Sequence, residues 1–231
     1  MMGSDWRESA RSGEAVALFD LDGTITRGDT YVAFLLAALA KHPWRLAGCP
    51  GLAVAAARFR LGRLGNDGLK AQFLRTVLGG LGKEDVDSMA ARFSVRCRGK
   101  MAKPAALGRI GWHRARGHRL VLVTAGLDIY AVPLGLALGF DDVVATRAGW
   151  DGGRLTGSLA GPNLRGGRKL DALEAAGLLP VSPHAESYAY CDHHSDLPLL
   201  CCARHRVAVD PTPRLAKLAS LHGIRIERWR R

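Results

Sequence analysis

The sequence lacks several features that would assign it to a protein class at once. Its five cysteines are an odd number without metal-ligand spacing, which indicates reduced thiols in a cytoplasmic protein. No run reaches the ~18 consecutive apolar residues of a membrane-spanning helix. Residues 1–14 lack the apolar stretch of a secretory signal, so we expect a cytoplasmic location. Aromatic residues make up only 6%, which is sparse for a protein that stacks nucleic-acid bases.

What the chain does contain is apolar residues and an uneven positive charge. With 231 residues, 48% of them hydrophobic, it can form one large domain or a core with a smaller insert. The net charge of +12 is concentrated in residues 58–120, which carry 15 Lys and Arg against 4 Asp and Glu, and in residues 203–231, with 8 against 2. Such blocks suit phosphorylated substrates, anionic membrane surfaces or nucleic acid, although they are also often a solvated face.

The most informative stretch follows a short apolar run near the N-terminus. Residues 15–19 predict a buried strand, after which Asp20 and Asp22 leave the backbone on the same side. Gly23 allows a tight turn and Thr24 can hydrogen-bond within it. A buried pair of carboxylates must be neutralised, and a divalent cation does so economically. The alternative is an acidic pair that merely caps a turn.

Periodicity along the remaining chain predicts alternating strands and helices. Further strands are expected at 119–124, 142–145, 185–191 and 206–210, with a hairpin at 151–157. Helices are expected at 31–40, 67–78, 83–98, from 104 onward, and at 127–138, 169–176, 196–203 and 211–221. This order predicts an α/β fold with an open, mostly parallel sheet, in which ligands bind at the carboxyl ends of the strands. Asp20, Asp22, Thr124 and Asp192 all fall at such ends.

The helical block after the first strand predicts a cap over that edge of the sheet. Within it, residues 44–63 are apolar and small in the centre, bounded by Trp44 and several arginines, and divided by Pro50-Gly51. They predict either a buried helical hairpin or an interfacial segment whose apolar face contacts lipid. We favour the buried form, because core helices are commoner.

Four motifs, taken in order, resemble those of the haloacid dehalogenase superfamily. The first motif is FDLDGTITRGD, which begins at Phe19, and the second is Thr124. The third is NLRGGRK, which ends at Lys169, and the fourth is YAYCDHHSDLPLL, which contains Asp192 and Asp196. The segment VDPTPRL, which begins at Val209, also fits the family. The similarity spans about residues 15–220. Within the superfamily, the chain most resembles subfamily IB, the phosphoserine-phosphatase-like branch with a helical C1 cap. This resemblance implies a Rossmann-like parallel core at 15–29 and 106–222, an all-helical cap at 30–105 and terminal extensions at 1–14 and 223–231.

The resemblance also implies a reaction, namely hydrolysis of a phosphate monoester through an aspartyl-phosphate. Asp20 would be the nucleophile and Asp22 the general acid and base. Mg²⁺ would be held by Asp20, the Asp22 carbonyl and Asp192, with Asp196 in its second shell. Thr124, the Ala125 N–H and Lys169 would bind the phosphoryl group.

Departures from the family pattern leave the substrate open. Cys191 and His193 flank Asp192 where the family usually has Ser or Gly before and Ser after, and Asp29 replaces a usual Glu. Phosphoserine is the family's first expectation for a small phosphorylated substrate. Residues 44–63 also resemble the cap of phosphatidylglycerophosphatase C-like members, so a lipid phosphatase in peripheral contact with the anionic inner membrane surface is an alternative. A basic nucleic-acid-binding protein on a hydrolase fold is the less favoured third, and the sequence makes no prediction of oligomeric state.

Overall fold

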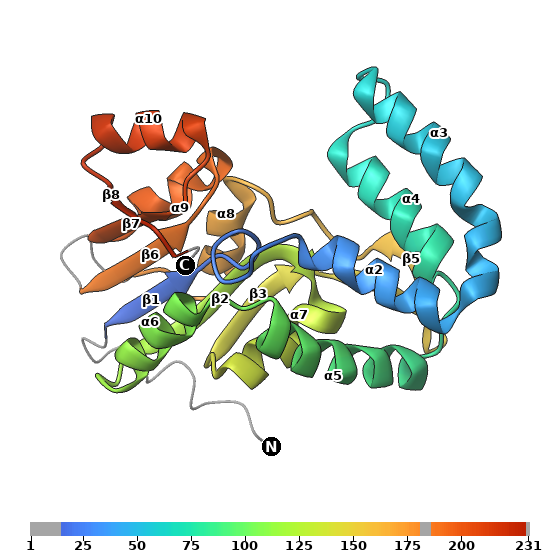
Figure 1. The fold of residues 1–231 in the computed structure, drawn as a ribbon, viewed down its shortest axis with the longest axis horizontal. Coiled ribbons are helices and arrows are strands. Elements are labelled where there is room, and N and C mark those ends of the chain that lie inside the picture. Colours follow the sequence, from blue (N-terminus) through green and yellow to red (C-terminus); the bar gives the residue numbers. More distant parts are fainter. Residues whose placement is uncertain (1–14, 181–185, 230–231) are drawn as a thin grey trace.

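A six-stranded sheet forms the centre of the computed structural model, which describes residues 15–180 and 186–229 (Figure 1). The predicted extension at 1–14 and the start of the strand predicted from Ala185 lie outside these residues. The strand order is β3-β2-β1-β6-β7-β8. The strands are β1 (Val16–Phe19), β2 (Arg119–Leu127), β3 (Asp142–Thr146), β6 (Ser187–Cys191), β7 (His205–Val209) and β8 (Arg225–Glu227).

Every neighbouring pair in this sheet is parallel. The central strand β1 pairs Phe19 with Leu122 of β2 on one side and with Tyr190 of β6 on the other. Because β1 is covered on both faces, it consists almost entirely of apolar residues. The carboxyl ends of β1, β2 and β6 therefore meet at one edge, as the sequence predicts.

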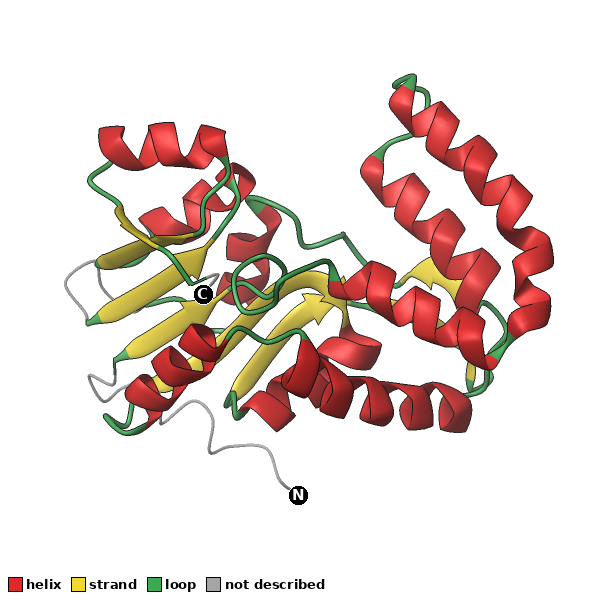
Figure 2. Ribbon diagram, viewed as in Figure 1, coloured by secondary structure: helices red, strands yellow, loops and turns green. Residues whose placement is uncertain are grey.

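Helices cover both faces of the sheet, and the predicted α/β fold is confirmed (Figure 2). One face packs on α8 (Arg168–Ala175), α9 (Leu197–Cys201) and α10 (Pro213–Leu221), with η2 (His194–Asp196) leading into α9. The opposite face packs on α6 (Pro104–Arg114) and α7 (Asp128–Leu138).

The predicted cap is helical and is inserted after β1. It contains α2 (Thr30–Lys41), η1 (Pro43–Gly48), α3 (Cys49–Arg60), α4 (Asn66–Leu78) and α5 (Lys83–Lys100). The chain enters and leaves it through paired segments, since Arg27 N donates to Met101 O and Lys103 N donates to Ile25 O, both at 2.9 Å. Figure 1 shows α3 and α4 extending beyond the end of the sheet.

The predicted division between core and cap does not coincide with a division of the hydrophobic core. Phe34 of α2, Phe93 of α5 and Tyr130 of α7 pack with ring centroids 4.9–5.5 Å apart. The hairpin predicted at 151–157 is β4 (Ala148–Asp151) with β5 (Arg154–Leu159), and it contacts α4 of the cap. One apolar cluster thus continues from the sheet into α2 and α5.

Two predictions require correction. Residues 44–63 are not a buried hairpin, because only Leu52 and Ala55 of α3 are buried. Pro50-Gly51 does not divide two helices either. It lies in the first turn of α3, where the backbone nitrogen of proline needs no hydrogen-bond partner within the helix. Residues 225–227 are not a terminal extension, because they pair with β7 as an edge strand. The segment is short and charged, so its pattern gives no strand signal.

No helix within residues 15–180 and 186–229 combines the length and hydropathy needed to cross a bilayer.

Candidate active site

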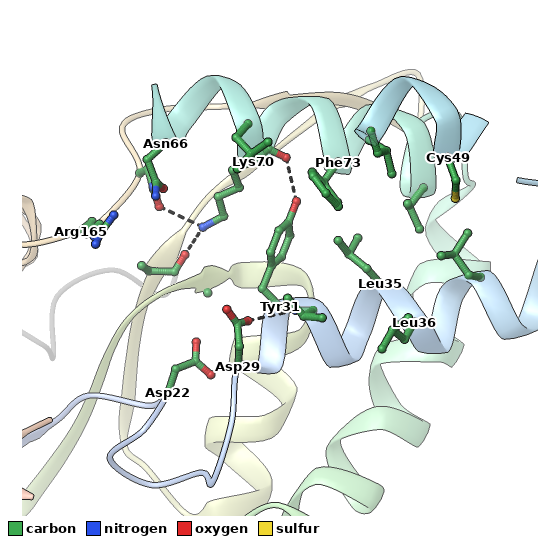
Figure 3. Close-up of a pocket in the computed structure, with 18 residues that line it drawn as sticks. Asp22, Asp29, Tyr31, Leu35, Leu36, Cys49, Asn66, Lys70, Phe73 and Arg165 are labelled. Atoms are coloured by element: carbon green, nitrogen blue, oxygen red, sulfur yellow. Dashed lines mark hydrogen bonds between the residues drawn. The ribbon is translucent and has the colours of Figure 1, made fainter. Parts of the chain in front are cut away.

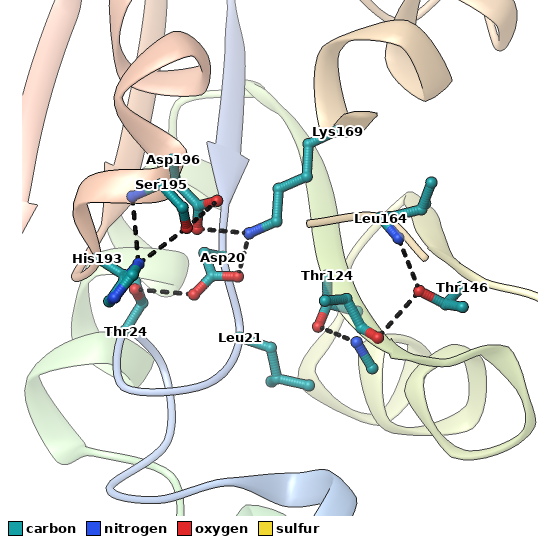
Figure 4. A network of polar contacts seen from close by, with 12 residues as sticks. Asp20, Leu21, Thr24, Thr124, Thr146, Leu164, Lys169, His193, Ser195 and Asp196 are labelled. Carbon is teal, nitrogen blue, oxygen red and sulfur yellow. Dashed lines mark hydrogen bonds and ion pairs between the residues drawn. The ribbon is translucent and has the colours of Figure 1, made fainter. Parts of the chain in front are cut away.

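Asp20, Lys169 and Asp196 form a buried ion network where β1 ends (Figure 4). The Nζ of Lys169, on the first turn of α8, lies 2.5 Å from Asp20 Oδ1 and 2.7 Å from Asp196 Oδ2. Thr24 Oγ1 donates to the second Asp20 oxygen at 3.3 Å. Burial, and then the negative charge of Asp196, raise the pKa of Asp20 despite the opposing effect of Lys169. Three predicted residues from three distant segments are therefore in contact, and both Asp20 oxygens are held.

Asp192 lies against the turn that follows β1. Gly23 has a φ of +77°, and a Cβ built there would lie 2.1 Å from Asp192 Oδ2, so only glycine fits both the backbone and the space. Burial and the charges of Asp20 and Asp196 raise the pKa of Asp192 to about 7. The end of β6 thus brings its carboxylate next to the first motif, as predicted.

Asp22 is directed toward the cap rather than toward Lys169. Its Oδ1 accepts a hydrogen bond from Thr30 N, in the first turn of α2, at 2.7 Å. Burial and the charges of Asp29 and Asp20 raise the pKa of Asp22 to about 7. The carboxyl lines a cavity between the sheet edge and the cap, while the Asp22 backbone stays beside Gly23.

Thr124 and Ala125 lie in an irregular part of β2. The register with β3 shifts between Thr124 and Leu127, and Thr124 Oγ1 accepts a hydrogen bond from Gly126 N at 2.9 Å. The Ala125 carbonyl accepts from Thr146 Oγ1 at 2.9 Å. Such a bulge turns successive peptide groups out of the ladder, and Ala125 and Gly126 both line the cavity. The phosphate-binding roles predicted for these residues remain predictions.

His193, the departure from the family motif, caps the turn that presents Asp196. Its Nδ1 accepts from Ser195 N at 3.1 Å and lies 2.8 Å from Ser195 Oγ. Burial and His194 lower the pKa of His193. The imidazole therefore takes over a capping task that small polar side chains often perform.

Two lysines at this site were not found from the sequence. Lys103 is buried, pairs with Asp210 at 2.9 Å and also donates to Gly23 O, so it braces the Gly23 turn. Lys70, on α4, donates to Ala125 O and to Asn163 Oδ1 at 3.0 Å. Burial lowers the pKa of Lys70 to about 8. Both lie on cap helices or linkers rich in basic residues, where no local pattern separates them from the exposed ones.

The carboxylates fit a divalent cation of the magnesium type. Asp20 and Asp196 share the single ammonium of Lys169, and Asp192, whose pKa is raised by the charges of both, fits into the space that Gly23 leaves free. Within the described ranges, no group of three or more His, Cys, Asp or Glu side chains is arranged as a metal cluster. The predicted set has only two side chains and the Asp22 carbonyl, which suits Mg²⁺ because it keeps several water ligands.

A cavity of about 530 Å³ extends from this edge into the cap (Figure 3). Asp22, Ala125 and Lys70 line the end nearest the sheet, and side chains of α2, α3 and α4 line the rest. The site therefore consists of polar strand ends with a partly open cavity beside Asp22.

Comparison with known proteins gives one family and several relatives. The model of haloacid dehalogenase-like hydrolases matches residues 17–200. Protein CicA of Caulobacter vibrioides is 32% identical over 159 residues, covering 66% of this chain and 68% of that protein. Phosphoserine phosphatase SerB1 of Mycobacterium tuberculosis is 27% identical over 94% of this chain and 71% of its own length.

Solved structures share the fold. A protein of unknown function from Bordetella pertussis superposes with a TM-score of 0.79 at 25% identity, covering 92% of this chain and 97% of its own. A substrate-bound phosphoserine phosphatase superposes with a TM-score of 0.63 at 22% identity, covering 94% and 93%.

The fold, the strand-end carboxylates and these relatives together define a hydrolase with a parallel α/β core and a helical cap. The chain belongs to the haloacid dehalogenase-like hydrolases, because the family model matches most of its length. Its relatives and structural neighbours include phosphoserine phosphatases, and the predicted branch and enzyme class are confirmed.

Proposed function

We propose that the protein hydrolyses phosphate monoesters through a phosphoaspartate formed on Asp20, with Mg²⁺ held by Asp20, the Asp22 carbonyl and Asp192. The observation that carries this proposal is the position of Asp20, buried at the end of β1 and in contact with Lys169 at 2.5 Å. Lys169 and Thr24 each hold one carboxylate oxygen, which orients the nucleophile before a substrate arrives.

The first step forms one bond to phosphorus and breaks another. An Asp20 oxygen attacks phosphorus, the bond from phosphorus to the ester oxygen breaks, and Asp22 donates its proton to the leaving alkoxide. Lys169 and the backbone near Ala125 stabilise the charge on the phosphoryl oxygens. When bound, Mg²⁺ supplies positive charge that offsets the repulsion between the carboxylates and the phosphoryl group.

The second step restores the enzyme. Asp22, now ionised, accepts a proton from water, and the resulting hydroxide attacks phosphorus so that the bond to Asp20 breaks and inorganic phosphate leaves. Asp22 suits both steps because it lines the substrate cavity and is positioned by Thr30 N, away from the Lys169 network.

The test is phosphate release with and without magnesium. Phosphoserine, the substrate named for the relatives, is compared with ethyl phosphate and p-nitrophenyl phosphate in Mg²⁺ and after EDTA. We expect release that depends on Mg²⁺ and falls at least about 10³-fold in Asp20→Asn. Asp141→Asn, on a surface acid before β3, is the matched control and should retain activity. Equal activity in Asp20→Asn would contradict the proposal.

A second candidate function is a lipid phosphatase at the membrane surface. It is favoured by exposed apolar and basic side chains on one surface of the cap. Large apolar side chains are exposed on η1, on α3 and in the turn that follows α3; they are Trp44, Leu46, Val54, Phe59 and Leu61. Arg58, Arg60 and Arg63, at the end of α3 and in that turn, are also exposed. Apolar side chains can enter the lipid interface, while each arginine near an anionic surface contributes about 1 kcal/mol. We propose that this surface, the cap end, contacts the inner face of the membrane from the cytoplasm.

Co-sedimentation tests the membrane contact directly. The protein should sediment with phosphatidylglycerol vesicles at low salt and less with phosphatidylcholine vesicles, and Trp44→Ser should weaken the binding. Leu221→Ser removes an exposed side chain of α10 and is the control. Absence of binding to anionic vesicles at low salt would exclude this candidate.

A further inference from the structure

The cap cavity points to a class of substrate. We infer that the alcohol released in the proposed reaction carries an apolar chain, which lies in the cavity between α2, α3 and α4. The inference rests on the proposed function, because it takes the reaction at Asp20 as given and asks what the leaving group must be.

The wall of the cavity is apolar beyond its inner end. The lining side chains there come from three helices: Val32, Leu35, Leu36 and Leu39 of α2; Cys49 and Leu52 of α3; and Leu69, Phe73 and Val77 of α4. The volume of about 530 Å³ is within the range of small-molecule sites. The space is therefore large enough for a chain of several carbons.

Polar residues are gathered at one end of the same cavity. Figure 3 shows Asp22, Asp29, Asn66, Lys70 and Arg165 together, with Phe73, Leu35 and Leu36 further along. Asp22 is the proposed proton donor to the ester oxygen, so the leaving alcohol must begin at this end. A chain that extends from that oxygen into the cavity meets apolar side chains next.

Several charged residues at the polar end are already engaged by the protein. Asp29 caps α2 by accepting from Val32 N at 3.0 Å, and Lys70 donates to Ala125 O and Asn163. Arg165 and the second oxygen of Asp29 could still pair with the charges of phosphoserine, but a charge carried further along the cavity would lose water against the apolar wall, which costs free energy. Burial of an alkyl chain against the same wall is favourable, because it removes apolar surface from water.

Two wall residues are exposed in a way that a ligand would relieve. Val32 is 49% and Leu36 is 59% exposed, although both belong to a helix whose other face is buried in the core. A bound alkyl chain would remove these side chains from water, and each buried methylene strengthens binding about threefold to fourfold.

A homologous series of substrates tests the inference. Phosphate release is measured with Mg²⁺ for ethyl, butyl, hexyl and octyl phosphate, all as monomers in solution, and for phosphoserine. We expect kcat/KM to rise about threefold to fourfold for each methylene that enters the cavity, and kcat/KM for octyl phosphate to exceed that for phosphoserine. A kcat/KM that stays level or falls with chain length would overturn the inference.

Variants locate the effect in the cavity. The ratio of kcat/KM for octyl phosphate to that for ethyl phosphate should fall about tenfold in Leu36→Asn and in Val32→Asn. The same ratio should not change in the controls Leu221→Asn and Val95→Asn, whose side chains are 80% and 75% exposed on α10 and α5. Both kcat/KM values of a variant are measured on the same preparation, so a smaller fraction of folded protein does not change their ratio. An unchanged ratio in both cavity variants would contradict the assignment of the chain to this cavity.

The design separates failure of the inference from failure of the proposed function. If no ester releases phosphate, the reaction at Asp20 is wrong; if ethyl phosphate or phosphoserine reacts without a preference for longer chains, only the inference is wrong. Hexadecyl phosphate in phosphatidylcholine vesicles distinguishes the source. Hydrolysis of hexadecyl phosphate in vesicles as well as of octyl phosphate in solution indicates a substrate held in the membrane. Hydrolysis of octyl phosphate alone indicates a substrate that is dissolved in water.

Discussion

Gly23 is the residue on which the predicted metal site depends most closely, because Asp192 occupies the space beside its Cα. Gly23→Ala would introduce a Cβ against Asp192 Oδ2 and displace that carboxylate. We expect the Mg²⁺ concentration for half-maximal activity to rise about 10- to 100-fold, the usual effect of disturbing the support of a metal ligand.

The control for Gly23→Ala is Gly80→Ala. Gly80 has a φ of +76°, against +77° for Gly23, but nothing lies within 4 Å of its added Cβ. Both variants carry the same backbone strain, so a difference in magnesium requirement isolates the contact with Asp192. Equal magnesium curves would contradict this account.

His113 makes stability depend on pH at a distance from the active site. Its Nε2 lies 2.9 Å from Tyr190 Oη, and burial, with the charges of His118, Arg109 and Arg116, lowers the pKa of His113 to about 3. The unfolded chain takes up a proton near pH 6.5 and the folded chain does not, so the stabilisation by neutral His113 is complete above pH 6.5 and is lost as the pH falls toward 3.

Urea unfolding in EDTA at two pH values measures this effect. The free energy of unfolding of the wild type relative to His113→Gln should fall by about 1.4 kcal/mol between pH 7.5 and pH 5.5. The comparison with the variant removes contributions of the acids at the active site. A difference that does not vary with pH would show that His113 is not held neutral.

The positions of residues were predictable from the sequence only where a motif fixed them, and the roles assigned to them stay predictions. Asp20, Lys169, Asp192 and Asp196 could be placed because each follows a recognisable strand or begins a helix. Lys70 could not, because its partners Ala125 and Asn163 are 55 and 93 residues away in the chain.

At the scale of elements, strands with apolar runs were predictable and marginal elements were not. The strands before Asp20 and Asp192 are almost entirely buried, and apart from Ser187 and the tyrosine hydroxyls of β6 they are apolar. By contrast β8 consists of Arg225, Ile226 and Glu227, and it is a strand only because the edge of β7 is available to it. The exposure of α3 was also unpredictable, since small apolar residues occur equally in buried helices.

The hairpin β4–β5 is attached to the cap by a close backbone approach. A Cβ at Gly157 would lie 2.5 Å from Arg75 Cα of α4. We expect Gly157→Ala to lower the free energy of unfolding by about 1–3 kcal/mol more than Gly153→Ala, which has the same φ to within a degree and open space around its Cβ. Thermal unfolding of the two variants measures this, and equal melting temperatures would mean that the hairpin yields freely.

At the scale of the molecule, the continuous core predicts that α2 and α5 unfold together with the sheet. Phe93→Ala in α5 should cost about 3–5 kcal/mol, because it leaves a cavity beside Phe34 and Tyr130. Circular dichroism and tryptophan fluorescence should report one coincident transition at a lower urea concentration. Phe59→Ala, on the exposed side of α3, should cost under about 1 kcal/mol. A separate early transition in Phe93→Ala would show that the cap is an independent unit.

The positive charge of the chain can be explained without a nucleic-acid partner. Much of the basic block at 58–120 lies on the cap, where it can serve an anionic substrate or surface. Lys103 is an exception, since it is buried in an ion pair.

The central claim, that phosphate passes through Asp20, is tested most directly by trapping the phosphoaspartate. Borohydride reduces an aspartyl phosphate to homoserine, which peptide mass spectrometry can locate after quenching during turnover of octyl phosphate or p-nitrophenyl phosphate. We predict homoserine at residue 20, none at residue 22, and none in protein incubated without substrate. Continued phosphate release with no modification at residue 20, or with modification at another acid, would contradict the account.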